Sequence, residues 1–156
     1  MNREIERKFR VVDDLYKSGS TSCLYKQGYL CTDKERTVRI RIAGEKGYIT
    51  IKGRTTGCSR AEYEYEIPLA DAASMLDTLC VKPLIEKIRY RCTGPDGKVW
   101  EVDEFLGENE GLVVAEIELA DENEPFARPA WLGEEVTGDM RYYNSYLSQN
   151  PYKGWK

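Results

Sequence analysis

The sequence predicts a mainly β (α+β) fold, in which about eight antiparallel strands close into a barrel and a few helices lie at its periphery. Three observations support this class. Most of the chain alternates between two kinds of residue with a period of two, as strands with two chemically different faces do. Gly, Asp, Asn and Pro residues separate these segments, as in turns. Seven of the segments gather their charged residues on one face, often with like charges side by side, and closing the sheet would place these faces inside a lumen.

The alternation defines the candidate strands. We expect them at about residues 3–11, 22–32, 36–43, 46–54, 60–67, 84–94, 98–106 and 112–120. Two short sequences between them, GEKG at 44–47 and GPDG at 94–97, are typical of hairpin turns. The strands on either side of each turn should therefore be antiparallel neighbours.

Two segments have helical spacing instead. After Pro68, apolar residues recur every three or four positions between residues 69 and 80, which predicts a short amphipathic helix. Residues 139–148 place Met140, Tyr143 and Leu147 on one side. This second helix could cap one end of the barrel or pack outside it.

Length and composition indicate one globular domain over residues 1–156, because the chain has no repeat, low-complexity segment or flexible linker. Charged residues make up 32% of the chain, but 23 basic residues oppose 27 acidic ones, so the formal net charge is only −4. This balance argues against a surface for nucleic acid or for an anionic membrane. The expected partner is a small molecule, bound by a monomer or a homodimer.

Cysteine and histidine usage narrows the chemistry. The five cysteines have no C-x-x-C spacing, and the chain does not open with a signal-like apolar stretch, which favours free thiols in a reducing cytoplasm. No window approaches the roughly 18 apolar residues of a membrane span. The chain has no histidine, which excludes serine–histidine and cysteine–histidine catalysis and leaves zinc with only scattered thiols.

Sorting each strand by parity separates its charged face from its apolar face. The first strand places Glu4, Glu6 and Lys8 on one face, with Ile5 and Phe9 on the other. Later strands repeat the pattern, with these residues on their charged faces: Arg39, Arg41, Lys52, Glu62, Glu64, Lys87, Arg89, Asp103, Glu116 and Glu118.

This pattern has two interpretations. An antiparallel sheet commonly has one face in water and one on a core. Against this, Glu-x-Glu and Arg-x-Arg pairs crowd one sign on one face, where like-charged neighbours are destabilising. A closed barrel would instead place carboxylate strands and guanidinium strands on opposite inner walls, and it would leave no exposed edge.

A bipolar lumen suits a polyanion that is accompanied by divalent cations. Arg and Lys match phosphate oxygens, whereas carboxylates hold hard metals. An all-oxygen set of ligands points to Mg²⁺ first, with Mn²⁺ as an alternative and Ca²⁺ as a non-productive competitor.

The segment Glu4-Ile5-Glu6-Arg7-Lys8 resembles the N-terminal E-x-E-x-K signature of the CYTH superfamily, the triphosphate tunnel metalloenzymes. Further segments resemble the successive tunnel strands of that family, and they occur in order: QGYL at 27–30, VRIR at 38–41, TIKG at 50–53, EYE at 62–64, EKIRY at 86–90, VD at 102–103 and AEIE at 115–118. The resemblance spans residues 2 to 147.

The resemblance implies an eight-stranded antiparallel tunnel and a Mg²⁺- or Mn²⁺-dependent reaction on a triphosphate. By motif position, these residues would bind phosphate oxygens: Lys8, Arg39, Arg41, Lys52, Lys87 and Arg89. An acidic wall would hold metal directly or through water, and it would consist of Glu4, Glu6, Glu62, Glu64, Asp103, Glu116 and Glu118.

Tyr29 matches a family landmark and has two interpretations, one as a packing residue and one as a catalytic partner of Lys8. Four further charged residues share the inward parity but lie near predicted strand ends, so we expect them at the tunnel mouths rather than at the substrate: Arg54, Glu66, Arg91 and Glu101.

The superfamily includes class IV adenylate cyclases, thiamine triphosphatases, RNA triphosphatases and inorganic tripolyphosphatases, so the fold does not settle the substrate. Residues 29–41 contain no histidine, whereas the cyclases have a His-Phe signature there. The sequence reveals no aromatic set that would stack on an organic group. Inorganic tripolyphosphate, cleaved to pyrophosphate and phosphate, is therefore the favoured substrate. Thiamine or nucleoside triphosphate is the alternative, followed by a cyclase or a binding module without turnover.

Overall fold

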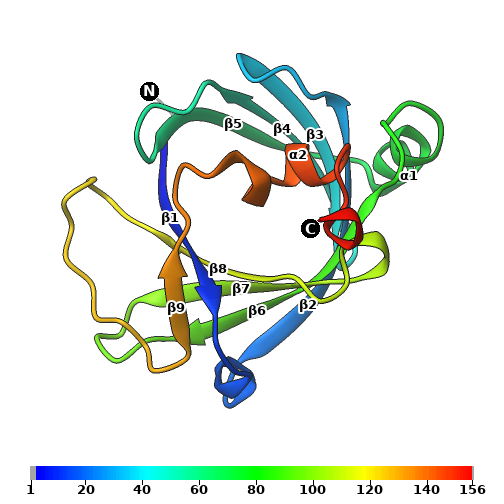
Figure 1. The fold of residues 1–156 in the computed structure, drawn as a ribbon. Helices are drawn as coiled ribbons and strands as arrows, with labels where there is room; N and C mark the ends of the chain where they lie inside the picture. The colour runs from blue at the N-terminus through cyan, green and yellow to red at the C-terminus, as the bar shows by residue number, and fades with distance from the viewer. Residues whose placement is uncertain (1–2, 156) are drawn as a thin grey trace.

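Nine strands form one antiparallel sheet in the computed structural model, which describes residues 3–155 (Figure 1). The strands are β1 (Arg3–Val11), β2 (Thr21–Cys31), β3 (Arg36–Ala43), β4 (Lys46–Gly53), β5 (Ser59–Ile67), β6 (Ile85–Thr93), β7 (Val99–Phe105), β8 (Val113–Glu118) and β9 (Leu132–Glu135). Their order is β5-β4-β3-β2-β6-β7-β8-β1-β9, and β5 also pairs with β1. Strands β1 to β8 therefore close into a barrel, which confirms the predicted fold class.

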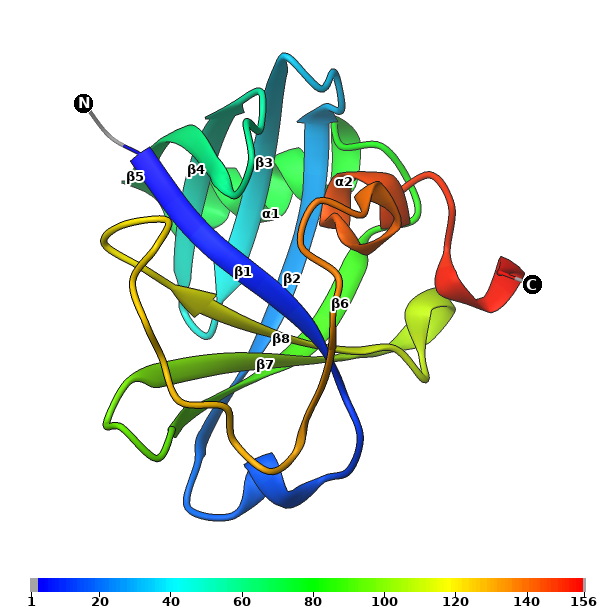
Figure 2. The ribbon, with the colours of Figure 1, turned by 60° about the vertical axis from the view of Figure 1, so that its left-hand side comes forward.

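Strand β1 closes the barrel because its two halves pair with different neighbours. Arg3 to Ile5 pair with β5, whereas Glu6 to Arg10 pair with β8. Figure 2 shows β1 running diagonally across the barrel between these two partners. The seam of the barrel is thus the strand that carries the E-x-E-x-K segment.

The short strand β9 was not predicted. It pairs with β1 outside the closed ring, and the register between the two strands shifts between Phe9 and Val11. Its sequence, LGEE, is only four residues long and has no clear alternation of apolar and polar residues. Pairing with an existing strand, rather than a local pattern, therefore defines this element.

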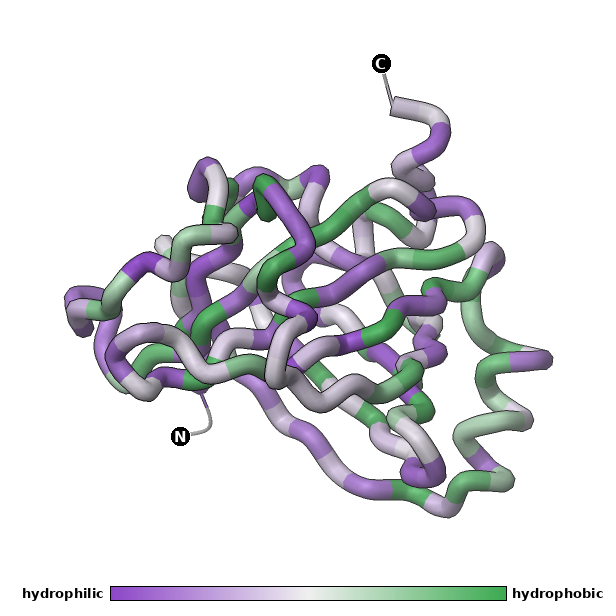
Figure 3. The backbone as a smooth tube through the Cα atoms, turned by 90° about the horizontal axis from the view of Figure 1, so that it is seen from below, coloured by the Kyte–Doolittle hydropathy of each residue, from purple (hydrophilic) through white to green (hydrophobic). Residues whose placement is uncertain are grey.

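The apolar faces of the strands point outward and form the cores, because the inner faces carry charge. Figure 3 shows hydrophilic and hydrophobic residues alternating along the chain. Helix α1 (Leu69–Thr78) packs outside β3 and β4, where Ala72 and Leu76 join a buried cluster with Ile40. It confirms the helix predicted at residues 69–80.

A second core lies beneath the connection from β8 to β9. There Phe9 and Trp100 pack edge to face, with ring centroids 5.6 Å apart, and Phe126 and Trp131 also meet Trp100 edge to face. This aromatic packing holds the outer face of β1 against β7. It thereby fixes the strand whose inner face carries Glu4, Glu6 and Lys8.

The predicted C-terminal helix at residues 139–148 is divided into two pieces. A 3₁₀ turn covers Met140–Tyr142, and α2 covers Asn144–Leu147. Leu147 is fully buried in a third core, together with Ile85 and Phe105. Residues 143–145 line the central cavity, and α2 lies within the ring of strands in Figure 1. The prediction that this segment caps one end of the barrel is therefore favoured over packing outside.

No helix within residues 3–155 has the length and apolar character needed to span a bilayer. The domain prediction covers residues 1–156, and its ends at 1–2 and 156 lie outside the described residues.

Candidate active site

All eight barrel strands contribute side chains to a central cavity of about 270 Å³. Its lining is almost entirely polar and consists of Glu4, Glu6, Lys8, Tyr25, Tyr29, Thr37, Arg39, Arg41, Thr50, Lys52, Arg60, Glu62, Glu64, Lys87, Arg89, Arg91, Glu101, Glu116, Glu118, Tyr143, Asn144 and Ser145. Every predicted site residue except Asp103 lines this cavity. The structure thus brings together side chains that are more than 100 residues apart in the sequence.

The strand order separates the two signs of charge. Strands β7, β8, β1 and β5 are consecutive around the barrel and supply most of the carboxylates. Strands β4, β3, β2 and β6 are also consecutive, and they supply Lys52, Arg39, Arg41, Lys87 and Arg89. We call these two sides the acidic wall and the basic wall. The arrangement is the bipolar lumen that the charge pattern predicts.

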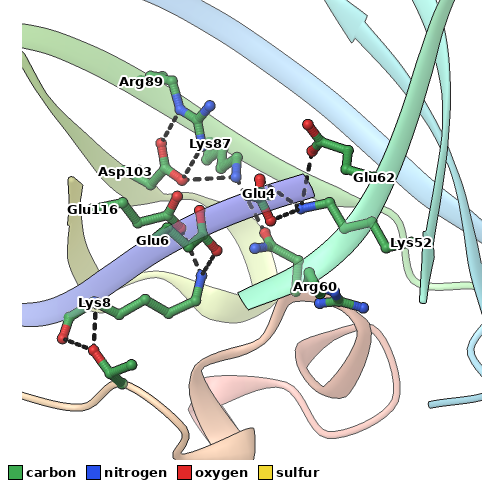
Figure 4. A network of polar contacts seen from close by, with 12 residues as sticks. Glu4, Glu6, Lys8, Lys52, Arg60, Glu62, Lys87, Arg89, Asp103 and Glu116 are labelled. Carbon is green, nitrogen blue, oxygen red and sulfur yellow. Dashed lines mark hydrogen bonds and ion pairs between the residues drawn. The ribbon is translucent and has the colours of Figure 1, made fainter. Parts of the chain in front are cut away.

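Two lysines are paired with the acidic wall (Figure 4). Lys8 Nζ lies 2.8 Å from Glu116 Oε1 and 3.2 Å from Glu6 Oε1. Lys52 Nζ reaches across from β4 and lies 2.8 Å from Glu4 Oε1. These ammonium groups therefore sit among the carboxylates, and they partly neutralise this side of the cavity.

Lys8 is held in its charged form. Its burial by itself lowers the pKa, but the charges of Glu116 and Glu6 outweigh burial, so the pKa of Lys8 is raised above its usual value. A lysine with a raised pKa is protonated at neutral pH. In this arrangement Lys8 can donate hydrogen bonds and attract anions, but it cannot accept a proton.

The carboxylates of the acidic wall remain crowded despite these lysines. Burial, and then the charge of Glu116, raise the pKa of Glu6 to about 7. Burial and the charges of Glu4 and Glu6 raise the pKa of Glu118 as well. Proximity of like charges disfavours ionisation unless a cation relieves it. The acidic wall therefore has the electrostatic character of a cation-binding surface.

The donor chemistry of this wall fits a hard divalent cation, because all the acidic side chains offer carboxylate oxygens. Within residues 3–155, however, no three Cys, Asp or Glu side chains already converge as a metal cage would. The lysines occupy positions between the carboxylates. A metal at this wall would complete its coordination with other ligands, such as water or phosphate oxygens.

Asp103 differs from its predicted place. Its oxygens accept hydrogen bonds from Arg89 Nε and Nη2 at 2.7 and 2.9 Å and from Lys87 Nζ at 2.7 Å, and the residue is only 1% exposed. Burial raises its pKa, but Arg89 and Lys87 outweigh this effect and lower the pKa to about 2. These two cations cover Asp103 and keep it from the cavity surface. The structure therefore joins it to the basic wall, because its cross-strand partner on β6 is Arg89.

The basic wall as a whole has more positive charge than its paired carboxylates neutralise, because Lys87 and Arg89 share the single carboxylate of Asp103. Burial lowers the pKa of Lys87 to about 7, and the nearby Arg89 and Arg41 add to this effect. Burial and the charge of Arg39 lower the pKa of Arg41, although a guanidinium stays protonated at neutral pH. Crowded cations in a buried site stabilise a bound anion.

Arg39 gives the clearest sign of an anion site. Its Nη2 donates to Thr50 Oγ1 at 3.2 Å and lies 3.5 Å from Glu64 Oε2. Its Nε is buried and has no hydrogen-bond partner within the described part of the chain. A buried donor without an acceptor is costly, so this N–H is suited to an oxygen of a bound ligand.

Tyr29 is only 5% exposed and packs in the core cluster that includes Ile85 and Leu147. It also lines the cavity. The structure thus combines both interpretations of this residue, and its catalytic role stays a prediction.

The sequence interpretation missed several cavity residues. Arg60, Thr37 and Thr50 have the same parity as predicted site residues on their strands, so alternation alone could have identified them. Arg91 and Glu101, which we expect at a tunnel mouth, also line the cavity, and the Arg91 side chain is exposed. Three C-terminal residues also line the cavity: Tyr143, Asn144 and Ser145. Alternation could not have identified them, because they do not lie in a strand.

A second cavity of about 400 Å³ adjoins the first and shares four lining residues with it: Thr37, Arg60, Tyr143 and Ser145. Met140, Tyr146 and Arg54 are among its other lining residues. The second cavity therefore presents two aromatic rings, those of Tyr143 and Tyr146, which the sequence did not reveal. Glu66, the fourth residue expected at a mouth, lines neither cavity.

Comparison with known proteins agrees with this geometry. The chain is 58% identical to an inorganic triphosphatase of Acetivibrio thermocellus over 156 residues, which cover 100% of this chain and 99% of that protein. It is 37% identical to an inorganic triphosphatase of Nitrosomonas europaea over 149 residues, covering 93% and 96% of the two chains.

Solved structures show the same architecture. The structure of an inorganic triphosphatase matches with a TM-score of 0.68 at 32% identity, covering 92% of this chain and 96% of that one. A putative adenylyl cyclase from Hippeastrum matches with a TM-score of 0.60 at 15% identity, covering 76% and 80%, and this likeness concerns the fold alone. The model of the CYTH domain family matches residues 2–145. The chain therefore belongs to the CYTH domain family.

Proposed function

We propose that this protein is a metal-dependent hydrolase that cleaves inorganic tripolyphosphate to pyrophosphate and phosphate inside the barrel. The observation that carries the proposal is the bipolar cavity, in which the buried Arg39 Nε has no partner among the described residues. The names of the two relatives, both inorganic triphosphatases, support the choice of substrate.

The basic wall would bind the phosphate chain. Arg39, Arg41 and Arg89 present guanidinium groups whose planar N–H donors match phosphate oxygens. Lys52 and Lys87 add point charges on the flanking strands β4 and β6. Because the substrate would accept hydrogen bonds from several strands at once, its oxygens would be oriented as well as neutralised.

The acidic wall would hold the metal, and Mg²⁺ is our first choice, with Mn²⁺ as an alternative and Ca²⁺ as an inhibitory competitor. The proposed ligands, direct or through water, are Glu4, Glu6, Glu62, Glu64, Glu116 and Glu118. When bound, the metal would supply charge neutralisation on the phosphates and acidify a water molecule. We propose Asp103 not as a ligand but as the residue that orients Arg89 and Lys87.

Lys8 would act as a charged donor among the carboxylates of the acidic wall. Its raised pKa keeps it protonated, so it would stabilise negative charge that develops on the phosphate rather than remove a proton from water. Tyr29, which lines the cavity from β2, would orient a water or a phosphate oxygen through its hydroxyl group.

A second candidate substrate is an organic triphosphate. The adjoining cavity presents Met140, Tyr143 and Tyr146, and such side chains could hold a nucleoside or thiamine group while the tunnel binds its phosphates. A class IV adenylate cyclase or a binding module without turnover is less favoured. Binding alone would not need an acidic wall, which repels phosphate unless metal intervenes.

Release of phosphate from tripolyphosphate, with and without Mg²⁺, tests the proposal directly. Pyrophosphate should be a poor substrate, because the basic wall, whose cations come from several strands, would bind three linked phosphates more tightly than two. ATP and thiamine triphosphate serve as comparisons. A higher kcat/KM for either organic triphosphate would transfer the assignment to the second candidate, and equal rates with pyrophosphate would contradict the tunnel arrangement.

We infer one domain over residues 1–156, with a small-molecule substrate and no nucleic-acid or membrane partner. A cytoplasmic location and a monomer or homodimer are likewise our proposals.

A further inference from the structure

Asn144 connects the C-terminal segment to the basic wall. It is the first residue of α2 and lines the central cavity, although α2 is not part of the barrel. Its Oδ1 accepts hydrogen bonds from Lys87 Nζ at 3.2 Å and from Gln27 Nε2 at 3.1 Å. Gln27 Oε1 in turn accepts one from Arg41 Nε at 3.1 Å. The Asn144 side-chain oxygen therefore links two cations of the basic wall, Lys87 directly and Arg41 through Gln27.

The chemistry of the partners fixes the direction of this chain. Arg41 can only donate hydrogen bonds, because a guanidinium has no acceptor. The amide of Gln27 must therefore turn its oxygen to Arg41 and its nitrogen to Asn144, and Asn144 must present its oxygen. Gln27 and Lys87 are fully buried. Loss of the acceptor at position 144 would leave the Gln27 amide nitrogen without this partner, and Lys87 Nζ would keep Asp103 but lose the acceptor that draws it toward α2.

Asn144 is itself held from outside the cavity. Leu147, three residues further along α2, is fully buried in the core formed with Ile85 and Phe105. The backbone oxygen of Asn144 accepts a hydrogen bond from Ser148 N at 3.0 Å. The packing of α2 thus sets where the Asn144 oxygen lies, independently of any ligand in the cavity.

We propose that Asn144 is a positioning residue for triphosphate hydrolysis, whose side-chain oxygen orients Lys87 and, through Gln27, Arg41 toward the phosphate chain. The inference rests on the function proposed above. An amide suits this role because it holds the cations without neutralising them. A carboxylate at the same place would accept the same hydrogen bonds, but it would add negative charge to a cavity that receives a polyanion, whereas Asp103 lies behind the cavity surface.

The test compares two changes at this position with a matched control. Asn144→Ala should lower kcat for tripolyphosphate about 10- to 100-fold, because it leaves the buried Gln27 donor unpaired and removes one of the two acceptors that orient Lys87. Asn144→Asp keeps both hydrogen bonds, so it should retain more of kcat but raise KM through repulsion. Asn150→Ala removes the same kind of side chain from the same segment, where its amide donates to Tyr146 O outside the central cavity, and it should behave as the wild type.

A double-mutant cycle separates positioning from a general effect of α2. Gln27→Ala and Asn144→Ala act on one hydrogen-bonded chain, so their effects on kcat should be clearly less than additive. Arg39→Ala should combine with Asn144→Ala nearly additively, because none of the described hydrogen bonds of Arg39 involves this chain. Wild-type kcat/KM in Asn144→Ala, or full additivity with Gln27→Ala, would overturn the proposal.

Two further readouts keep the test decisive. If Asn144→Ala does not fold, Asn144→Asp carries the test, and an unchanged KM in that variant would overturn the proposal. If the wild-type protein does not hydrolyse tripolyphosphate with Mg²⁺, the proposed function fails separately. Calorimetric affinity of the metal-free protein for tripolyphosphate then decides: a loss of about fivefold or more relative to Asn150→Ala supports positioning, and equal affinities refute it.

Discussion

Arg89 and Asp103 are directly opposed on the paired strands β6 and β7, and two hydrogen bonds of 2.7 and 2.9 Å join the guanidinium to the carboxylate. Lys87 Nζ lies 2.7 Å from the same carboxylate. This buried group is the structural basis of the basic wall, because it fixes two cations that line the cavity. The first prediction concerns its energetic cost and its pH dependence.

Asp103→Asn should lower the free energy of unfolding by about 3 to 5 kcal/mol, because it leaves two buried cations without their anion. The folded pKa of Asp103 is depressed to about 2, below that of the unfolded chain. Its stabilising contribution is therefore present at neutral pH and is lost as the pH falls from about 4 through 2. Urea denaturation at several pH values measures both effects.

The control for this prediction is Asp33→Asn, which removes an exposed partner of Arg36. An exposed pair contributes little to stability, so this variant should unfold nearly as the wild type does. Equal losses in the two variants would show that the Asp103 cluster has no special energetic role.

The second prediction concerns Arg39. Arg39→Ala should reduce kcat/KM for tripolyphosphate about 100- to 1,000-fold, because it removes a buried guanidinium group whose Nε has no acceptor among the described residues. Arg39→Lys should recover little, because an ammonium cannot reproduce two donors in one plane. Steady-state kinetics of both variants measure the effect. Arg36→Ala, on the same strand but exposed, should keep wild-type activity, and full recovery by lysine would contradict a bidentate role.

The third prediction concerns metal. Chelation should abolish turnover, and Glu4→Gln or Glu6→Gln should sharply raise the Mg²⁺ concentration needed for half-maximal activity. Titration of phosphate release against Mg²⁺ measures this requirement. Glu122→Gln, which does not line the cavity, is the control and should titrate as the wild type. Undiminished turnover by the chelated enzyme would refute the assignment of the acidic wall.

The fourth prediction separates the roles of Tyr29 and Lys8. Tyr29→Phe keeps the ring that packs in the core, so stability should change little, but loss of the orienting hydroxyl group should lower kcat with KM nearly constant in steady-state kinetics. Lys8→Ala should be more damaging, because it removes a protonated group from between Glu6 and Glu116. An unchanged kcat in Tyr29→Phe would leave this residue a packing role only.

The alternation of side chains between the two faces of each strand predicted much of the site. Alternation placed Glu4, Glu6 and Lys8 on one face of one strand, and the structure places all three in the cavity. The same argument applied strand by strand, and Asp103 alone among the predicted residues does not line the cavity. Side-chain direction in a strand is a local property, so neighbouring residues are sufficient to determine it.

What the sequence could not determine depends on contacts between distant segments. The order of strands around the barrel, which gathers the carboxylates on one wall and the guanidiniums on the other, arises from long-range pairing such as Arg3 with Ala61. The burial of Asp103 beneath Arg89 needs that order as well.

The C-terminal segment shows the same limit. Its apolar spacing indicated a helix, but packing divided it at Tyr143 and brought Asn144 against Gln27 and Lys87. The sequence by itself therefore determined the fold class, the two faces of each strand and the kind of ligand that its charges suit. Only the tertiary structure decided which charges meet, because ion pairs and hydrogen bonds across the lumen join residues whose separation in the chain exceeds any local pattern.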